Sequence, residues 1–223
     1  MPPTPAGPRT SAQLAAVAEI DPAVLADAPS DAAHRAVVQH LVSGAKYAEA
    51  VRFIAHALPR REGVWWAWVT AKRASGPTPA PPIKAVLEAT ERWIAQPSDA
   101  NRRAAWDAAQ AADIGTPAGC AGAAAFFAGE SIAPSNVQAL PPGEFDASKM
   151  IAGAVLMSAV ATEPEKAPEK YLASIQQGLD VVSKIKLWPG DTSAPLEPPP
   201  PAPVAVRETK PSRRPSAPSS TTA

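Results

Sequence analysis

The sequence predicts an all-α protein, a compact bundle of about seven or eight short helices with disordered Pro-rich termini. Two patterns indicate this within its 223 residues. Apolar and polar residues show no sustained alternation of the kind that half-buried strands require, and good helix formers such as Ala, Leu, Glu, Lys and Arg dominate. Pro and Gly also divide the central part of the chain into segments of the length of ordinary helices.

The 28 prolines suggest how the chain is organised. We expect a flexible segment over residues 1–29 with a short helix at 11–20, capped by Ser11 and closed by Asp21-Pro22. Residues 30–188 form the helical domain. Residues 189–223 are rich in Pro and Ser, bury little apolar surface and are predicted to be disordered. This tail is either a solubilising end or a polyproline ligand for a partner.

Three helices are predicted in the first half of the domain, at 31–43, 45–58 and 62–75. Ser30 is a suitable N-cap for the first helix, and Gly44 a suitable residue just beyond its end. Pro59 ends the second helix and Gly76-Pro77 ends the third. The short link at Gly44 predicts that the first two helices form an antiparallel hairpin.

The second half of the domain is predicted to hold five helices. Pro81 or Pro82 begins the first, and Ser98 caps the second. The third is rich in Ala and Gly, which favours close helix packing, and it could mediate oligomerisation. The fourth is apolar nearly all round and is therefore expected to be central. Their ranges are about 82–96, 99–112, 118–128, 146–161 and 167–185.

The most unusual segment runs from Arg60 to Trp68 and combines charged and aromatic side chains. Helical spacing predicts one wide apolar face that holds all three of its indoles, with Lys72 on the same side. Such a face is either an aromatic seam of the core or a surface that binds a peptide or ligand. The candidate binding residues of this segment are Arg60, Arg61, Glu62, Trp65, Trp66, Trp68 and Lys72.

Arg102 and Arg103 complete the candidate binding set. They lie near the start of a predicted helix, where the helix dipole disfavours cations, so we expect them to pair with acids such as Asp99. Charge also divides along the chain. Residues 46–103 carry ten basic and five acidic side chains, whereas residues 104–188 carry five basic and nine acidic ones. The two parts either pack against each other or offer a basic face to an acidic protein.

Several classes of function find no support in the residue pattern. The three histidines lack metal-ligand spacing, Cys120 is expected to be a small core residue, and no catalytic, metal or cofactor site is predicted. The balanced formal charge argues against nucleic acid as a partner. No apolar run is long enough for a membrane span. The expected location is the cytoplasm.

A set of short motifs, taken together, resembles a family of uncharacterised, Ala-rich bacterial proteins known as a domain of unknown function. The resemblance spans about residues 29–188 and implies a cytosolic helical protein, with a link to bacterial secretion or signalling genes and no catalytic residues to transfer. The motifs lie at 58–62, 64–66, 97, 101–105, 116–119, 124–127, 132–134, 152–155 and 178–180.

The leading interpretation is a non-enzymatic protein-interaction or adaptor protein with an unidentified protein partner. The alternative is a small-ligand binder or enzyme, with a pocket near the helix that carries Trp65 and Trp68. A third hypothesis is a subunit that forms homo-oligomers through the Ala- and Gly-rich helix at 118–128.

Overall fold

The computed structural model describes residues 9–28, 33–134, 136–188 and 194–200, and these residues form an all-α fold. Within them lie nine α-helices, two short 3₁₀ helices and no strand, which confirms the predicted fold class. The helices are α1 (Ser11–Val17), α2 (His34–Ser43), α3 (Tyr47–Ala57), α4 (Arg60–Ala74), α5 (Pro81–Ala95), α6 (Asp99–Ala111), α7 (Pro117–Phe127), α8 (Asp146–Val160) and α9 (Ala167–Lys184).

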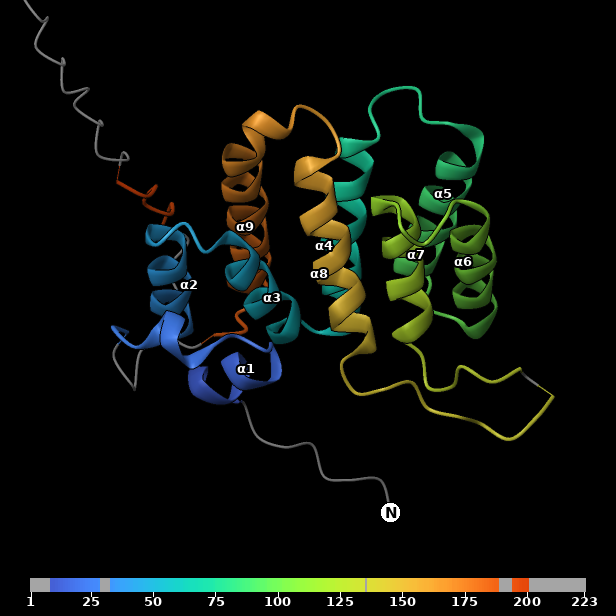
Figure 1. Ribbon diagram of the computed structural model, residues 1–223. Coiled ribbons are helices and arrows are strands. Elements are labelled where there is room, and N and C mark those ends of the chain that lie inside the picture. The colour runs from blue at the N-terminus through green and yellow to red at the C-terminus, as the bar shows by residue number, and fades with distance from the viewer. Residues whose placement is uncertain (1–8, 29–32, 135, 189–193, 201–223) are drawn as a thin grey trace, which may run out of the picture.

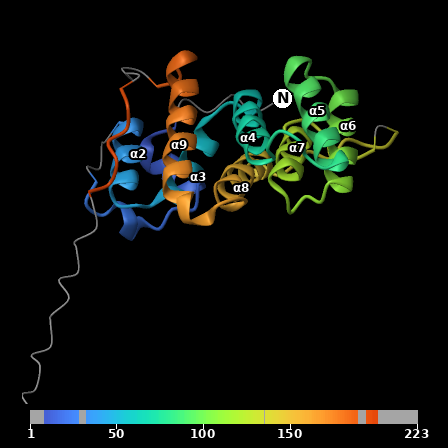
Figure 2. The same ribbon diagram turned by 90° about the horizontal axis from the view of Figure 1, so that it is seen from above.

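The helices are arranged side by side across the molecule. Helices α2, α3 and α9 form one end, with α1 beside them (Figure 1). Helices α4 and α8 lie in the middle, and α5, α6 and α7 form the other end, as the view from above also shows (Figure 2). There α7 packs on both α4 and α8, and α5 also contacts α4 directly. Helix α4 therefore contacts both halves of the fold, since it packs on α8 and α7 on one side and on α9 on the other.

The interior is centred on α7 and α8. Every residue from Ala118 to Phe126 is buried, and most are Ala or Gly, so neighbouring helices approach closely. A Cβ added at Gly122 would lie 2.6 Å from Val86 Cγ2 and 3.1 Å from the carbonyl oxygen of Ala105. The hypothesis of oligomerisation through this helix is therefore wrong, because the bundle itself already covers its surface. The prediction that the helix at 146–161 is central is confirmed by the buried side chains of α8.

Most helix boundaries lie within two or three residues of the predicted ones. The Ser98 hydroxyl caps α6 by accepting from the amide of Asn101, and Gly76 ends the α4 region with a φ of 70°. Pro59, however, precedes α4 directly, so α4 begins at Arg60 instead of Glu62. This places both Arg60 and Arg61 in the first turn of a helix.

The link between α2 and α3 differs from the prediction by one residue. Gly44 has an ordinary φ of −84°, and Ala45 takes the left-handed conformation with a φ of 54°. The amides of Ala45 and Lys46 donate to the carbonyls of Val42 and Leu41, which is the Schellman pattern of helix ends. These two hydrogen bonds offset the cost of the left-handed alanine. The predicted cap Ser30 lies outside the described residues.

The N-terminal segment is part of the core in residues 9–28, whereas we expected it to be flexible. Thr10, and not Ser11, caps α1 and forms a reciprocal pair of hydrogen bonds with Gln13. Leu14 and Ile20 are buried, and α1 packs against α3. Asp21 and Pro22 do not simply end a helix, because Asp21 caps the following 3₁₀ helix, Pro22–Leu25.

The predicted disordered tail also contains an ordered piece. Residues 189–193 and 201–223 lie outside the described residues, but residues 194–200 lie against the body of the protein without helix or strand structure. Leu196 of this piece is partly buried and packs on the core. The hydrogen bonds that hold it come from α2 and α9.

Candidate functional site

The three tryptophans of α4 point into three different environments instead of sharing one face. Trp66 is fully buried, and its Nε1 donates to the carbonyl of Ser174 in α9 at 2.9 Å. Trp68 faces α5, where its Nε1 donates to the carbonyl of Leu87, also at 2.9 Å. The Lys72 ammonium lies 4.4 Å from the centre of a Trp68 ring. Trp66 and Trp68 thus join helices, and Trp65 lies in a surface groove.

The groove around Trp65 is the best candidate for a functional site in the described residues. It lies between α4 and α9, at the end of α5, and has a volume of about 420 Å³. Trp65 is half-buried, and Ile185 is 37% exposed. The groove is lined by Arg61, Glu62, Trp65, Ile94, Gln177, Asp180, Val181, Lys184 and Ile185.

Charged side chains of both signs lie around this groove. Arg61 donates from Nε to the carbonyl of Ile94 at 2.7 Å, so its position is held by the last turn of α5. Asp180 accepts a hydrogen bond from Gln176 at 2.8 Å. Glu62 and Lys184 also line the groove. The combination of an aromatic ring, aliphatic side chains and charges of both signs is typical of a surface that binds protein.

One residue of the groove lining carries a polar atom with an unused hydrogen-bonding capacity. Gln177 Oε1 is buried, and none of the described residues donates a hydrogen bond to it. A buried carbonyl oxygen without a donor is destabilising by about 1–3 kcal/mol. Because Gln177 lines the groove, a rotation of its side chain that turns this oxygen toward the groove would let an N–H or O–H group of a bound molecule satisfy it.

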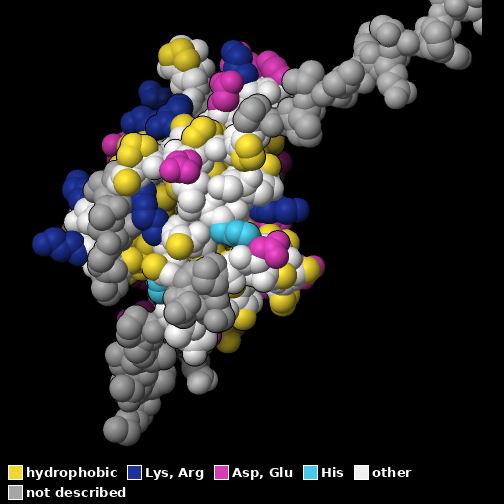
Figure 3. Space-filling model, turned by 90° about the vertical axis from the view of Figure 1, so that its left-hand side faces the viewer, with side chains coloured by type: hydrophobic (Ala, Val, Ile, Leu, Met, Phe, Trp, Pro, Cys, Tyr) yellow, Lys and Arg dark blue, Asp and Glu magenta, His cyan; other side chains and the backbone are white. Residues whose placement is uncertain are grey.

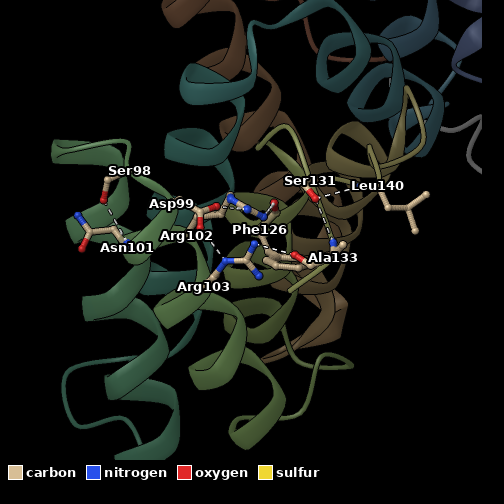
Figure 4. A network of polar contacts seen from close by, with 9 residues as sticks. All are labelled: Ser98, Asp99, Asn101, Arg102, Arg103, Phe126, Ser131, Ala133 and Leu140. Carbon is tan, nitrogen blue, oxygen red and sulfur yellow. Dashed lines mark hydrogen bonds and ion pairs between the residues drawn. The ribbon is translucent and has the colours of Figure 1, made fainter. Parts of the chain in front are cut away.

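Arg102 and Arg103 lie in a separate polar network at the start of α6, shown in Figure 4. Asp99 accepts from Arg102 Nη2 and, at 2.7 Å, from Arg103 Nε. Hydrogen bonds from Arg103 and Arg102 hold the pKa of the Asp99 carboxyl below its ordinary value. The expected pairing with Asp99 is therefore confirmed. Arg102 Nη1 also donates to the main-chain carbonyl of Phe126, and Arg103 Nη2 donates to that of Ala133.

The same network fastens the loop that follows α7. Arg102 is 3% exposed and passes so close to Gly129 that a Cβ there would lie 2.3 Å from its Cδ. Ser131 Oγ accepts from the amides of Ala133 and Leu140, which closes the loop on itself (Figure 4). A cavity of about 550 Å³ lies between this loop and α6, but the two arginines that line it are already bound to Asp99 and the carbonyls.

The arginines of the predicted binding set share one structural role, because each donates to a carbonyl at the end of a helix or in a loop. Arg60 Nη1 donates to the carbonyl of Ala128 at the end of α7. Arg61 donates to the carbonyl of Ile94 at the end of α5, and Arg102 donates to that of Phe126 at the end of α7. Cations are favoured at these helix ends, where carbonyls lack helical partners. Of the predicted set, only Arg61, Glu62 and Trp65 come together at the groove.

The groove residues on α9 were missed by sequence reasoning, although a signal for them exists. Gln177, Val181 and Ile185 follow one another at intervals of four and so form a stripe on a helix. Beside this stripe lies a second one that is fully buried, formed by Ile175, Leu179 and Val182. The second stripe consists only of apolar residues, so its pattern is easier to recognise in the sequence. Ile94 gave no comparable signal, because only the packing of α5 against α4 brings it to Trp65.

The histidines and the cysteine take structural positions. His34 stacks on Trp188 with ring centres 5.1 Å apart, and His40 bonds to the carbonyl of Val24. Burial lowers the pKa of His56 below its ordinary value and raises that of Cys120 to about 11. Within the described ranges, no three His, Cys, Asp or Glu side chains are grouped so that they could hold a metal ion. No helix among these residues is long and apolar enough to cross a membrane.

The fold and the groove define this chain as an all-α helical bundle with an aromatic surface groove. The sequence model of a family of unknown function, DUF6931, matches residues 37–182. The chain therefore belongs to this family, as the short motifs along the sequence predicted. No curated protein and no solved structure matches the chain. The matched range includes α3 to α8 and nearly all of α9, so it contains the whole groove apart from Lys184 and Ile185.

Proposed function

We propose that this protein is a non-enzymatic protein-interaction module, or adaptor, and that the groove between α4 and α9 is its contact surface. The observation that carries the proposal is the position of Trp65, which is half-buried between aliphatic side chains and beside charges of both signs. Residues that dominate binding energy at protein interfaces are often Trp and Arg in such settings. The proposal places the protein in the bacterial cytoplasm, with a role in secretion or signalling.

The chemistry of the groove favours a segment of another protein as its occupant. Arg61 and Lys184 are balanced by Glu62 and Asp180, so the lining does not attract a polyanion such as nucleic acid. Arg61, Asp180, Lys184 and Ile185 are exposed, which makes the site an open groove. Small-molecule sites usually enclose most of the ligand. We expect a partner segment with an apolar side chain against Trp65 and an N–H donor for Gln177.

Capture from the cells that carry the gene tests this proposal. The wild-type chain is compared with Trp65→Ser and Ile185→Ser, which remove the aromatic and aliphatic parts of the groove. Val160→Ser is the matched control, since Val160 is 47% exposed at the end of α8 and does not line the groove. Circular dichroism and thermal unfolding establish that each variant is folded.

The expected result is a protein that the wild type and Val160→Ser retain and that both groove variants lose. Loss of one well-placed apolar or aromatic contact weakens binding by about tenfold or more. If Trp65→Ser and Ile185→Ser, while folded, capture the same proteins as the wild type, the groove is not the contact surface and the proposal is wrong.

The second candidate function is binding of a small ligand in the same groove. Gln177 Oε1 favours it, because a buried acceptor without a donor also suits an amide or hydroxyl of a small molecule. Native mass spectrometry of the protein isolated from its own cells tests this candidate. A bound mass that disappears in Gln177→Leu supports it, and the mass of the chain alone contradicts it.

A further inference from the structure

The ordered piece of the tail, residues 194–200, is held through its main chain. It runs beside α2 in Figure 2. The side-chain amide of Gln39 in α2 forms a pair of hydrogen bonds with Glu197. Its Oε1 accepts from the Glu197 amide at 3.0 Å, and its Nε2 donates to the Glu197 carbonyl, also at 3.0 Å. Such a two-point contact fixes both the position and the direction of an extended chain.

A second glutamine, from α9, binds the neighbouring residue of the tail. Gln176 Oε1 accepts from the Leu196 amide at 2.9 Å. The Nε2 of the same Gln176 amide donates to Asp180 at 2.8 Å, and this hydrogen bond orients Oε1 toward the tail. Arg35 of α2 donates to the carbonyl of Ala194. Helices α2 and α9 therefore form a main-chain binding site, which we term the α2–α9 peptide site, with Arg35, Gln39 and Gln176 as its residues.

The sequence of the bound piece suits this site. Leu196 and Glu197 are adjacent residues that both have an amide hydrogen. The Leu196 amide donates to Gln176, and the Glu197 amide donates to Gln39. Pro198, Pro199 and Pro200 follow, and proline has no amide hydrogen, so these residues leave no donor unsatisfied. Proline also favours the extended conformation before binding, which lowers the entropy cost of ordering the segment. Leu196 supplies the apolar contact with the core.

We propose that the α2–α9 peptide site recognises extended segments of the type Pro-Leu-x-Pro-Pro, and that residues 194–200 of the same chain are its resident occupant. This site is distinct from the Trp65 groove, since Gln176 contacts the tail whereas Gln177 lines the groove. The surface at this end of the molecule, seen in Figure 3, exposes hydrophobic side chains among basic and acidic ones. A protein that presents the same type of segment competes with the tail.

The path of the chain favours binding by the same molecule. Trp188 is buried and stacks on His34 of α2, so it lies next to a helix that holds the tail. Only residues 189–193 separate Trp188 from Ala194. A connection this short keeps the effective concentration of the tail at the site in the millimolar range or above. The tail of a second copy would have to compete with that concentration.

Hydrogen exchange of the Leu196 and Glu197 amides in the full chain tests occupancy of the site. We expect protection by about tenfold or more in the wild type, with no dependence on protein concentration. Gln39→Ala together with Gln176→Ala removes the protection. Gln110→Ala, an exposed glutamine on α6, is the matched control and leaves the protection unchanged. Free exchange of both amides in the wild type contradicts the proposal, and protection that fades on dilution shows that a second copy supplies the tail.

A labelled peptide, Ala-Pro-Leu-Glu-Pro-Pro-Pro, tests recognition of an external segment. The full chain with Leu196→Asp and Glu197→Pro loses the apolar contact and the Glu197 donor, so its site is free. We expect fluorescence anisotropy to show binding at least about tenfold tighter than to the wild type, whose own tail competes. Gln39→Ala with Gln176→Ala in the freed chain abolishes that binding. A freed chain that does not bind the peptide overturns the recognition of external segments.

Discussion

At the scale of single residues, three of the predicted binding arginines stabilise helix ends. The sequence showed arginines next to aromatic residues, which is also the composition of a binding surface. The structure uses Arg60, Arg61 and Arg102 to bind carbonyls that the helices leave without partners. The pairing of Arg102 with Asp99 was predictable from a spacing of three residues, but its carbonyl partner was not, because Phe126 lies on another helix.

Replacing Arg102 by methionine should destabilise the fold more than the same change at Arg103. Arg102 is buried and lies 4.9 Å from the centre of the Phe126 ring, so its loss removes a hydrogen bond, a cation–π contact and the ion pair with Asp99. We expect a decrease in the unfolding free energy of about 2 kcal/mol. Arg103 is partly exposed, and about 1 kcal/mol or less is expected there. Urea denaturation measures the unfolding free energy of both variants. Equal losses in the two variants would contradict the assigned role of Arg102.

His56 should make the fold less stable in mild acid. Its Nδ1 donates to the carbonyl of Arg52, and its Nε2 is buried with no partner among the described residues, so protonation would create a buried donor without an acceptor. Burial lowers the pKa of His56 below the ordinary 6.5. The unfolded chain therefore takes up a proton first as the pH falls, and the folded state loses stability below about pH 6.5.

His56→Gln should remove this part of the pH dependence. Urea denaturation between about pH 8 and pH 5 measures it as the difference between the wild type and the variant. Asp99 does not interfere, because its pKa lies below its ordinary value and it stays ionised in this range. Parallel pH profiles for the two proteins would show that His56 is not held neutral by the fold.

At the scale of helices, the boundaries were predictable and the neighbours were not. Pro81, Ser98 and Gly76 act locally, through a fixed φ, a capping hydroxyl and a left-handed turn, so the sequence alone indicates them. Which side of a helix meets which other helix depends on packing across the whole chain. For this reason the three indoles of α4 were expected on one face, and only the fold shows that Trp65 alone meets the groove.

Gly122→Ala should force α7 away from its neighbours. The new Cβ would lie 2.6 Å from Val86 Cγ2, 3.0 Å from Ala109 Cβ and 3.1 Å from a backbone oxygen of α6, and these atoms are themselves confined. We expect a loss of about 1–3 kcal/mol of unfolding free energy. Gly44→Ala is the control, since its nearest contacts are ordinary at 3.6 Å, and it should change stability by less than about 0.5 kcal/mol. Equal effects of the two changes would contradict the close packing of α7.

At the scale of the whole molecule, the ends of the described chain close one side of the bundle. Residues 9–28 pack on α3 through α1, and residues 194–200 lie across α2 and α9. Low hydrophobicity and many prolines suggested flexible ends, because composition reports only how little apolar surface a segment can bury. It does not report hydrogen bonds between a proline-rich main chain and glutamines of other helices, one of which, Gln39, lies 158 residues away in sequence.

Cys120 should report the opening of the whole bundle. Burial raises the pKa of its thiol to about 11, so at neutral pH the thiol is protonated as well as shielded. We expect a thiol reagent to label it only as fast as the bundle opens, with faster labelling in Gly122→Ala. Labelling of the native wild type at the rate of an unfolded control would show that the α7–α8 interior is accessible.

The most direct test of the central claim, that the Trp65 groove contacts a partner protein, is photo-crosslinking in the cells of origin. A photoreactive amino acid replaces Lys184 at the edge of the groove, and a control chain carries it at the exposed Asp107 on α6, at the other end of the bundle. We expect a protein that is crosslinked at position 184, is absent at position 107, and is lost when Trp65→Ala is added. Crosslinks that are the same at both positions, or that persist without the indole, would contradict it.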